Sequence, residues 1–462
     1  MLSETEAGAR PHAVAAPDIS MSNSLTARLY GRLSGAARDG GGRPGKAEAR
    51  NGLIHIAALS ATKLADGLID PKLVLAWLVN ALGAGGLVVG LLVPVREAGS
   101  LLPQMVLTRW LHLARTRKRF WALGSALQGL AALAIAAVAF LLEGAAAGWA
   151  VLGCLALLAV ARAACSISHK DALARTIPKG RRGSLSGAAG SVASTLVLSF
   201  AALLALGVVP LSVTAIALAV AVAGGLWLFA AAVFLGLEER ERDENSDGQD
   251  LASLVTPLRD DPMLRRFIGA RALLAATAFA PPFIVMLSSG DGAEGEASLG
   301  TLGPLMIASA AASILSAYAW GRLSDRSSRL TLIGAGLTAA AALAIAAGAG
   351  LATGGLGGVA GAVAAIFAAQ IAYEGVRIGR KTHLTDMADD DERARYTALS
   401  NTVIGGVLLL GGGFGLLAEW AGPAWTLAAL ALMCLAATPF AYALEEVQVE
   451  VKANAETQAE EG

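Results

Sequence analysis

Charged residues are scarce in this chain of 462 residues: they make up 16% of it, with lysine and arginine balancing aspartate and glutamate at 36 each. Soluble globular domains average about 25% charged residues, and nucleic-acid binders need a basic excess for their phosphate contacts. The mean hydropathy is +0.60. The composition therefore excludes a soluble enzyme, a disordered chain and a protein that binds nucleic acid.

Cysteine and histidine are also rare. The three cysteines, Cys154, Cys165 and Cys434, lie in apolar runs, and the five histidines form no cluster. No spacing fits a zinc site or a disulfide framework, so we expect packing cysteines, no metal and no cofactor. The chain has no phosphate-binding glycine loop, and the Ser-x-x-Lys match that ends at Lys63 has no companion motif. We therefore predict that the protein is not an enzyme.

Apolar stretches of about 20 residues, the length at which a helix crosses a bilayer, recur along the chain. They predict an all-α integral membrane protein with 12 transmembrane helices. The expected spans are 52–70, 84–107, 120–142, 149–168, 185–206, 212–236, 264–288, 300–320, 330–351, 356–378, 397–418 and 424–444.

Polar segments divide these spans into two equal sets. We predict a cytosolic tail at 1–51, a six-helix bundle at 52–236, a cytosolic linker at 237–262, a second six-helix bundle at 263–444 and a cytosolic tail at 445–462. The first tail lacks the apolar core of a secretory signal. It is either a solvated tail or, over 24–37, a short cationic helix on the membrane surface.

The loops predict which side is cytoplasmic. Loops after the even-numbered spans hold most of the 36 basic residues, whereas the opposite loops hold one, Lys72. Cytoplasmic loops carry the excess of lysine and arginine, so both termini are expected in the cytoplasm. The Ala- and Gly-rich composition is typical of bacterial proteins and indicates the inner membrane.

The two halves echo each other. Residues 167–192 and 378–403 follow corresponding spans and share five identical residues when aligned. The loop Gly321–Arg329 resembles the cytosolic signature of the major facilitator superfamily, whereas the corresponding stretch 108–119 keeps the basic cluster and lacks the aspartate. The resemblance implies two bundles that rock around a central cavity. It makes Asp325, Arg326 and Arg329 gating candidates, although they could instead only set the topology.

Charged residues inside the predicted spans are functional candidates by default, because each is costly at a helix centre. Arg96 and Glu97 are the sharpest site, because Pro94 and Pro103 bracket them and adjacent helical residues diverge by about 100°. The full candidate set for substrate or proton binding is Arg96, Glu97, Gln104, Lys63, Asp66, Arg162, Glu374 and Arg377.

Each candidate also has a structural interpretation. Lys63 with Asp66, and Glu374 with Arg377, are three residues apart and can pair on one helix face, and Arg162 could brace two helices. Two further charges are expected to be structural: Asp70 at a helix end near the outer interface, and Arg271 extending to the cytosolic face.

These observations favour a secondary active transporter of a small solute that works by alternating access, with protons as the candidate coupling ion through Glu97, Asp66 and Glu374. Its expected partners are the lipid bilayer, an unidentified solute and protons, and it is expected to act as a monomer. Two alternatives stay open: a membrane-embedded scaffold or assembly factor on the same fold, and a passive channel.

Overall fold

The computed structural model describes Tyr30 and residues 46–104, 106–107, 116–178, 182–239, 258–288, 302–387 and 390–447. In these ranges the chain is helical and contains no strand, which confirms the all-α prediction. Most of the tails 1–51 and 445–462, and most of the linker 237–262, lie outside the described residues, as does the predicted surface helix 24–37 apart from Tyr30.

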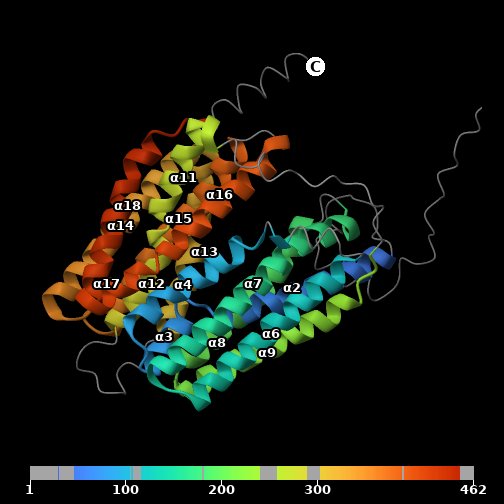
Figure 1. The fold of residues 1–462 in the computed structure, drawn as a ribbon, viewed down its shortest axis with the longest axis horizontal. Helices are drawn as coiled ribbons and strands as arrows, with labels where there is room; N and C mark the ends of the chain where they lie inside the picture. The colour runs from blue at the N-terminus through green and yellow to red at the C-terminus, as the bar shows by residue number, and fades with distance from the viewer. Residues whose placement is uncertain are drawn as a thin grey trace, which may run out of the picture.

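The helices form two groups (Figure 1). The N-terminal half contains α2 (Lys46–Leu68), α3 (Val74–Ala81), α4 (Gly86–Leu101), α6 (Arg117–Leu141), α7 (Gly144–Thr176), α8 (Arg182–Ala205) and α9 (Val213–Leu235). The C-terminal half contains α11 (Pro262–Leu274), α12 (Ala276–Ser288), α13 (Leu302–Arg326), α14 (Ser328–Thr353), α15 (Val359–Asp386), α16 (Asp390–Leu410), α17 (Gly413–Ala421) and α18 (Pro423–Tyr442).

Ten of the helical segments in the described residues are long and apolar enough to cross a membrane. They correspond to the last ten predicted spans. The predicted span 52–70 falls on α2 and the predicted span 84–107 on α4, whereas α3 lies in the segment predicted as the loop between them. Helix α2 carries Lys63 and Asp66, and α4 has only 16 helical residues, so both are less apolar or shorter than the others.

Two spans that occupy the same place in their halves are interrupted. The first breaks between α2 and α3, at Ile69–Leu73. The seventh is interrupted at Ala275, between α11 and α12, and carries Pro281 and Pro282 inside α12. Prolines remove backbone donors and weaken the helical ladder. Interrupted helices at matching positions of two repeats mark the binding region in many transporters.

The two halves meet at one end of the molecule, where α4 packs on α17 and α8 packs on α13. A Cβ atom added to Gly90 would lie 2.3 Å from the Cα of Gly415, and one added to Gly303 would lie 2.5 Å from the backbone nitrogen of Ala205. Small residues permit such backbone contact between membrane helices. We call this the closed end. The glycine run 411–415 supplies one side of this contact.

Away from the closed end the halves diverge (Figure 1). The opposite end, which we call the open end, carries the start of α2, the end of α9, the start of α11 and the end of α18. The same kind of contact closes each half here: Glu239, four residues after α9, accepts from the backbone of Arg117 at 3.0 Å, and Glu446, four residues after α18, accepts from Ser327 at 2.7 Å. The halves are therefore built alike but separated at this end.

Candidate functional site

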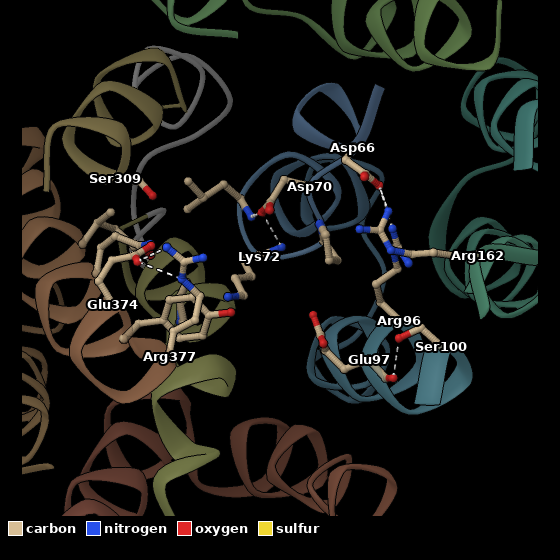
Figure 2. Close-up of a pocket in the computed structure, with 16 residues that line it drawn as sticks. Asp66, Asp70, Lys72, Arg96, Glu97, Ser100, Arg162, Ser309, Glu374 and Arg377 are labelled. Atoms are coloured by element: carbon tan, nitrogen blue, oxygen red, sulfur yellow. Dashed lines mark hydrogen bonds and ion pairs between the residues drawn. The ribbon is translucent and has the colours of Figure 1, made fainter. Parts of the chain in front are cut away.

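A cavity of about 450 Å³ lies where the two halves face each other (Figure 2). Its walls come from the α2–α3 turn, α4 and α7 on one side and from α12, α13 and α15 on the other. Four acidic and four basic side chains line it. They are Asp66, Asp70, Glu97, Glu374, Lys72, Arg96, Arg162 and Arg377.

Asp66 is the centre of the charge cluster on the N-terminal side. Arg96 donates to its Oδ1 at 2.8 Å, and Arg162 forms a second salt bridge to the same oxygen. Three helices, α2, α4 and α7, therefore meet at one carboxylate. Lys63 does not join them: it is exposed and donates to the backbone oxygen of Ser186 at 3.0 Å. Of the two interpretations of Lys63 and Asp66, the pairing of one with the other is not formed: Asp66 instead binds two arginines from other helices.

The turn between α2 and α3 places two further charges at the cavity. Asp70 accepts from the backbone nitrogens of Lys72 at 2.8 Å and Leu73 at 3.0 Å, which satisfies donors at the start of α3. This is the expected helix-end role, but it lies at the central cavity and not at the outer interface. Lys72, expected in an outer loop, also lies here, because α3 continues the first span beyond the turn.

On the C-terminal side, Glu374 and Arg377 form the expected pair on α15, with an Nη2–Oε2 distance of 2.5 Å. Gln370 donates to Glu374 at 3.3 Å and to Ser313 at 3.0 Å. Arg377 is half-exposed toward the cavity, whereas Glu374 is buried. This pair is therefore anchored through its carboxylate and presents its guanidinium to the space between the halves.

Glu97 differs from the other carboxylates of the cavity. Arg96 and Glu97 diverge as expected, since Arg96 turns to Asp66. The Glu97 side chain has no hydrogen bond or salt bridge in the part of the chain that the structure describes. Figure 2 shows its carboxylate facing the space between the two charge clusters.

Glu97 also lines a second cavity of about 190 Å³, toward α11 and α16. Arg271 lines it too and is buried, donating to Ser400 at 2.7 Å and to Asn401 at 3.0 Å. The expectation that Arg271 extends to the cytosolic face is wrong, because its guanidinium turns inward to polar groups of α16. Arg377 and Tyr373 line both cavities.

The remaining candidates lie elsewhere. Gln104 donates to the backbone of Ser100 at 2.7 Å and lines neither cavity. Asp325 and Arg326 are exposed at the end of α13, and Arg329 pairs with Glu446 at 3.2 Å. In the described residues, no group of three or more histidine, cysteine or acidic side chains is placed to hold a metal ion.

Sequence reasoning missed Lys72, Tyr373 and Arg271 as site residues. Each had a signal. Lys72 is the lone exception to the charge asymmetry of the loops, Tyr373 precedes a charged pair in a span, and Arg271 is an arginine inside an apolar run. Their grouping required the spatial approach of α3, α11 and α15.

The model of the Major Facilitator Superfamily matches the sequence over residues 58–369 and again over 294–461. The chain belongs to this superfamily. No curated protein matches the sequence significantly.

Solved structures of superfamily transporters share the fold. A point mutant of the nucleoside transporter NupG superposes with a TM-score of 0.66 at 11% identity, covering 85% of this chain and 99% of that one. The xylose transporter XylE from E. coli, in an inward open conformation, gives a TM-score of 0.62 at 11% identity over 85% and 95% of the two chains. A POT family transporter bound to a thioalcohol-conjugated peptide gives 0.62 at 10% identity over 84% and 94%.

Membership in the Major Facilitator Superfamily confirms an integral membrane protein with a transporter fold. Sequence identities of 10% and 11% establish the fold alone. The solute of this chain is therefore inferred from the residues of its own cavity.

Proposed function

We propose that this protein is a secondary active transporter that moves a small solute by alternating access. The observation that carries the proposal is the charged cavity of about 450 Å³ between two halves that touch at one end and diverge at the other. A site between two rigid bundles becomes reachable from either side when the bundles rock about it.

The open end is the cytoplasmic end in this proposal, so the conformation is inward-facing. It carries the basic loops, the start of α2 and the end of α18, and positive residues favour the cytoplasm. The likeness to an inward open xylose transporter supports the assignment. Both termini would then be cytoplasmic, in the inner membrane of a bacterium.

Protons are the proposed coupling ion, with Glu97 as their main carrier. Its carboxylate faces the cavity and has no partner among the described residues, so it can gain or lose a proton without breaking an existing ion pair. Asp66 and Glu374 are held by arginines, so protonation there would first have to release a salt bridge. We assign them a secondary role in coupling.

Asp325, Arg326 and Arg329 are proposed to help close the cytoplasmic side. Asp325 and Arg326 are exposed while the halves are apart, which is the state expected when a gate is open. On closure, a carboxylate at this helix end can accept from the N-terminus of a facing helix. Loss of that contact would accompany inward opening.

The test measures access to the cavity from each side. Ser100 lines the cavity, so a Ser100→Cys protein lacking Cys154, Cys165 and Cys434 is reconstituted in vesicles and labelled with an impermeant thiol reagent. A second version adds Leu91→Cys and Gly412→Cys to cross-link the closed end, where a Cβ on Gly412 would lie 2.3 Å from a Leu91 methyl carbon.

Alternating access predicts labelling from both sides before cross-linking and from the cytoplasmic side alone afterwards. Labelling from the cytoplasmic side alone in both versions would indicate a static scaffold. Labelling from both sides at rates that the cross-link leaves unchanged would indicate a channel. Reduction of the cross-link before labelling, with the label quantified on the peptide that contains residue 100, restores two-sided labelling in a transporter and serves as the internal control.

A further inference from the structure

Arg271 of α11 is a buried charge with neutral partners. Its side chain belongs to a residue that is 9% exposed. Its two terminal nitrogens donate to the Ser400 hydroxyl and to the Asn401 side-chain oxygen, and its Nε is buried without a hydrogen-bond partner. No carboxylate of the described residues forms a salt bridge with it, whereas Arg96 and Arg377 each have one.

Neutral acceptors orient a guanidinium but do not balance its charge. Buried charges in proteins are normally paired, since burial removes the hydration that stabilises them. An ionised side chain inside a membrane span therefore indicates a function. Ser400 and Asn401 hold two edges of Arg271 and leave its Nε edge unsatisfied, so among the described residues its charge is not balanced and a bound anion would balance it.

The cavity beside Arg271 is strongly basic. Arg377 and Arg380, three residues apart on α15, line it together with Arg271, and Glu97 is its one acidic lining residue. Arg377 is partly neutralised by Glu374. Arg380 is half-buried and has no hydrogen bond or salt bridge in the described part of the chain. Two arginines that have no carboxylate partner among the described residues thus share a space of about 190 Å³.

This space adjoins the central cavity, because Glu97, Tyr373 and Arg377 line both. A solute in the central cavity is therefore one layer of side chains away from Arg271. Movement of Glu97, which has no hydrogen bond or salt bridge among the described residues, would join the two spaces. The second cavity is lined by α4 from the N-terminal half and by α11, α12, α15 and α16 from the C-terminal half.

We infer that Arg271 and Arg380 form an anion-binding subsite, which takes the carboxylate or phosphate group of the transported solute. The planar guanidinium suits both groups because it donates two parallel hydrogen bonds. The inference rests on the proposed function and deepens it: the solute is an organic or inorganic anion. Glu97 is the one carboxylate that faces the same arginines, so an incoming anion takes the place of Glu97 as their counter-charge.

The experiment measures thermal unfolding of the full chain, delipidated in detergent, with sodium phosphate, succinate or lactate as probes. A sodium chloride series at equal ionic strength corrects for screening. We expect at least one probe to raise the melting temperature saturably beyond chloride, because a ligand that binds only the folded state stabilises it. Arg271→Lys and Arg380→Gln are expected to weaken the apparent affinity at least tenfold. Arg322→Gln, an exposed arginine of α13, is the matched control and should leave it unchanged.

Arg380→Gln keeps the test decisive if the Arg271 variant fails to fold, since it removes no hydrogen bond or salt bridge of the described residues. Probes that act no better than chloride, or affinities unchanged in the variants that fold, would overturn the anion site. Stabilisation by phosphatidylglycerol added as mixed micelles with the detergent, but by none of the three soluble anions, would assign the arginines to a lipid headgroup and also overturn it. The labelling of Ser100→Cys does not use the three anion probes. A protein that shows alternating access but binds none of the probes therefore keeps the proposed function and loses this subsite.

Discussion

The ammonium group of Lys72 lies 3.4 Å from the centre of the Tyr373 ring. Lys72 belongs to the turn between α2 and α3, and Tyr373 belongs to α15, so this contact joins the two halves of the protein at the central cavity. A cation over an aromatic face is attracted by about 0.5–2 kcal/mol, more as water is removed. The contact is therefore strong enough to bias the relative positions of the halves and weak enough to break during transport.

We predict an interaction energy of about 1 kcal/mol between Lys72 and Tyr373. It is measured by unfolding the wild type, Lys72→Met, Tyr373→Leu and the double variant. The matched control is the exposed pair of Arg322 and Tyr318, whose guanidinium lies 5.7 Å from the ring centre within one helix. The Arg322 guanidinium also donates to the Tyr318 hydroxyl at 3.0 Å, so that control cycle should give about 0.2–0.5 kcal/mol, the value of an exposed pair four residues apart on a helix. Equal values from the two cycles would contradict a special role for the contact across the cavity.

Removal of the Asp66 carboxylate is expected to destabilise the N-terminal half. Asp66→Asn leaves Arg96 and Arg162 without their shared counter-ion, and breaking a buried pair costs about 3–5 kcal/mol. The Arg162 side chain is 37% exposed, so the loss should fall at the lower end, about 3 kcal/mol. Lys63→Gln, one turn away on α2, should change stability by less than about 0.5 kcal/mol, because Lys63 is exposed. Similar losses in both variants would argue against the three-helix charge cluster.

Glu97 is expected to be required for uphill transport on a proton gradient. Glu97→Gln keeps the size of the side chain but cannot release a proton, so accumulation of the solute in proteoliposomes should fall to the level reached without a gradient. Glu143→Gln, which changes an exposed carboxylate before α7, should leave uphill accumulation unchanged. This measurement requires a known solute. A Glu97→Gln protein that still accumulates that solute uphill on a proton gradient would show that Glu97 does not couple transport to protons.

The glycine contact at the closed end is expected to hold the inward-facing state. Gly90→Val places a side chain where a single Cβ would already lie 2.3 Å from the Cα of Gly415, so α4 and α17 must separate. Labelling of Ser100→Cys from the side of the closed end should then rise several-fold. Gly413→Val is the control, because a Cβ at Gly413 meets nothing within 4 Å. Equal labelling in both variants would show that this contact does not close the cavity.

Much of the architecture could be predicted from the order of the residues. Twelve apolar runs, a polar centre and one-sided basic loops are one-dimensional patterns, and the bilayer converts them directly into helices and sides. The Glu374–Arg377 pair was also predictable, since three residues on a helix fix the distance between two side chains.

The partners of the other charges were decided by tertiary structure. Lys63 and Asp66 have the same spacing as Glu374 and Arg377, yet Asp66 binds two arginines from α4 and α7. The packing of helices that are far apart in sequence decides which of several possible partners a charged side chain binds. Helical spacing contains no information about that.

The chain by itself determined that this is a membrane protein with two like halves and with charges inside its spans. Only the folded arrangement decided that Lys72 lies at the centre, that Glu97 stands without a partner among the described residues, and that Arg271 turns inward to Ser400 and Asn401. The physical reason is that the length of an apolar segment, which decides whether it can cross a bilayer, depends only on consecutive residues. The electrostatic environment of a side chain is instead the sum over every helix packed around it.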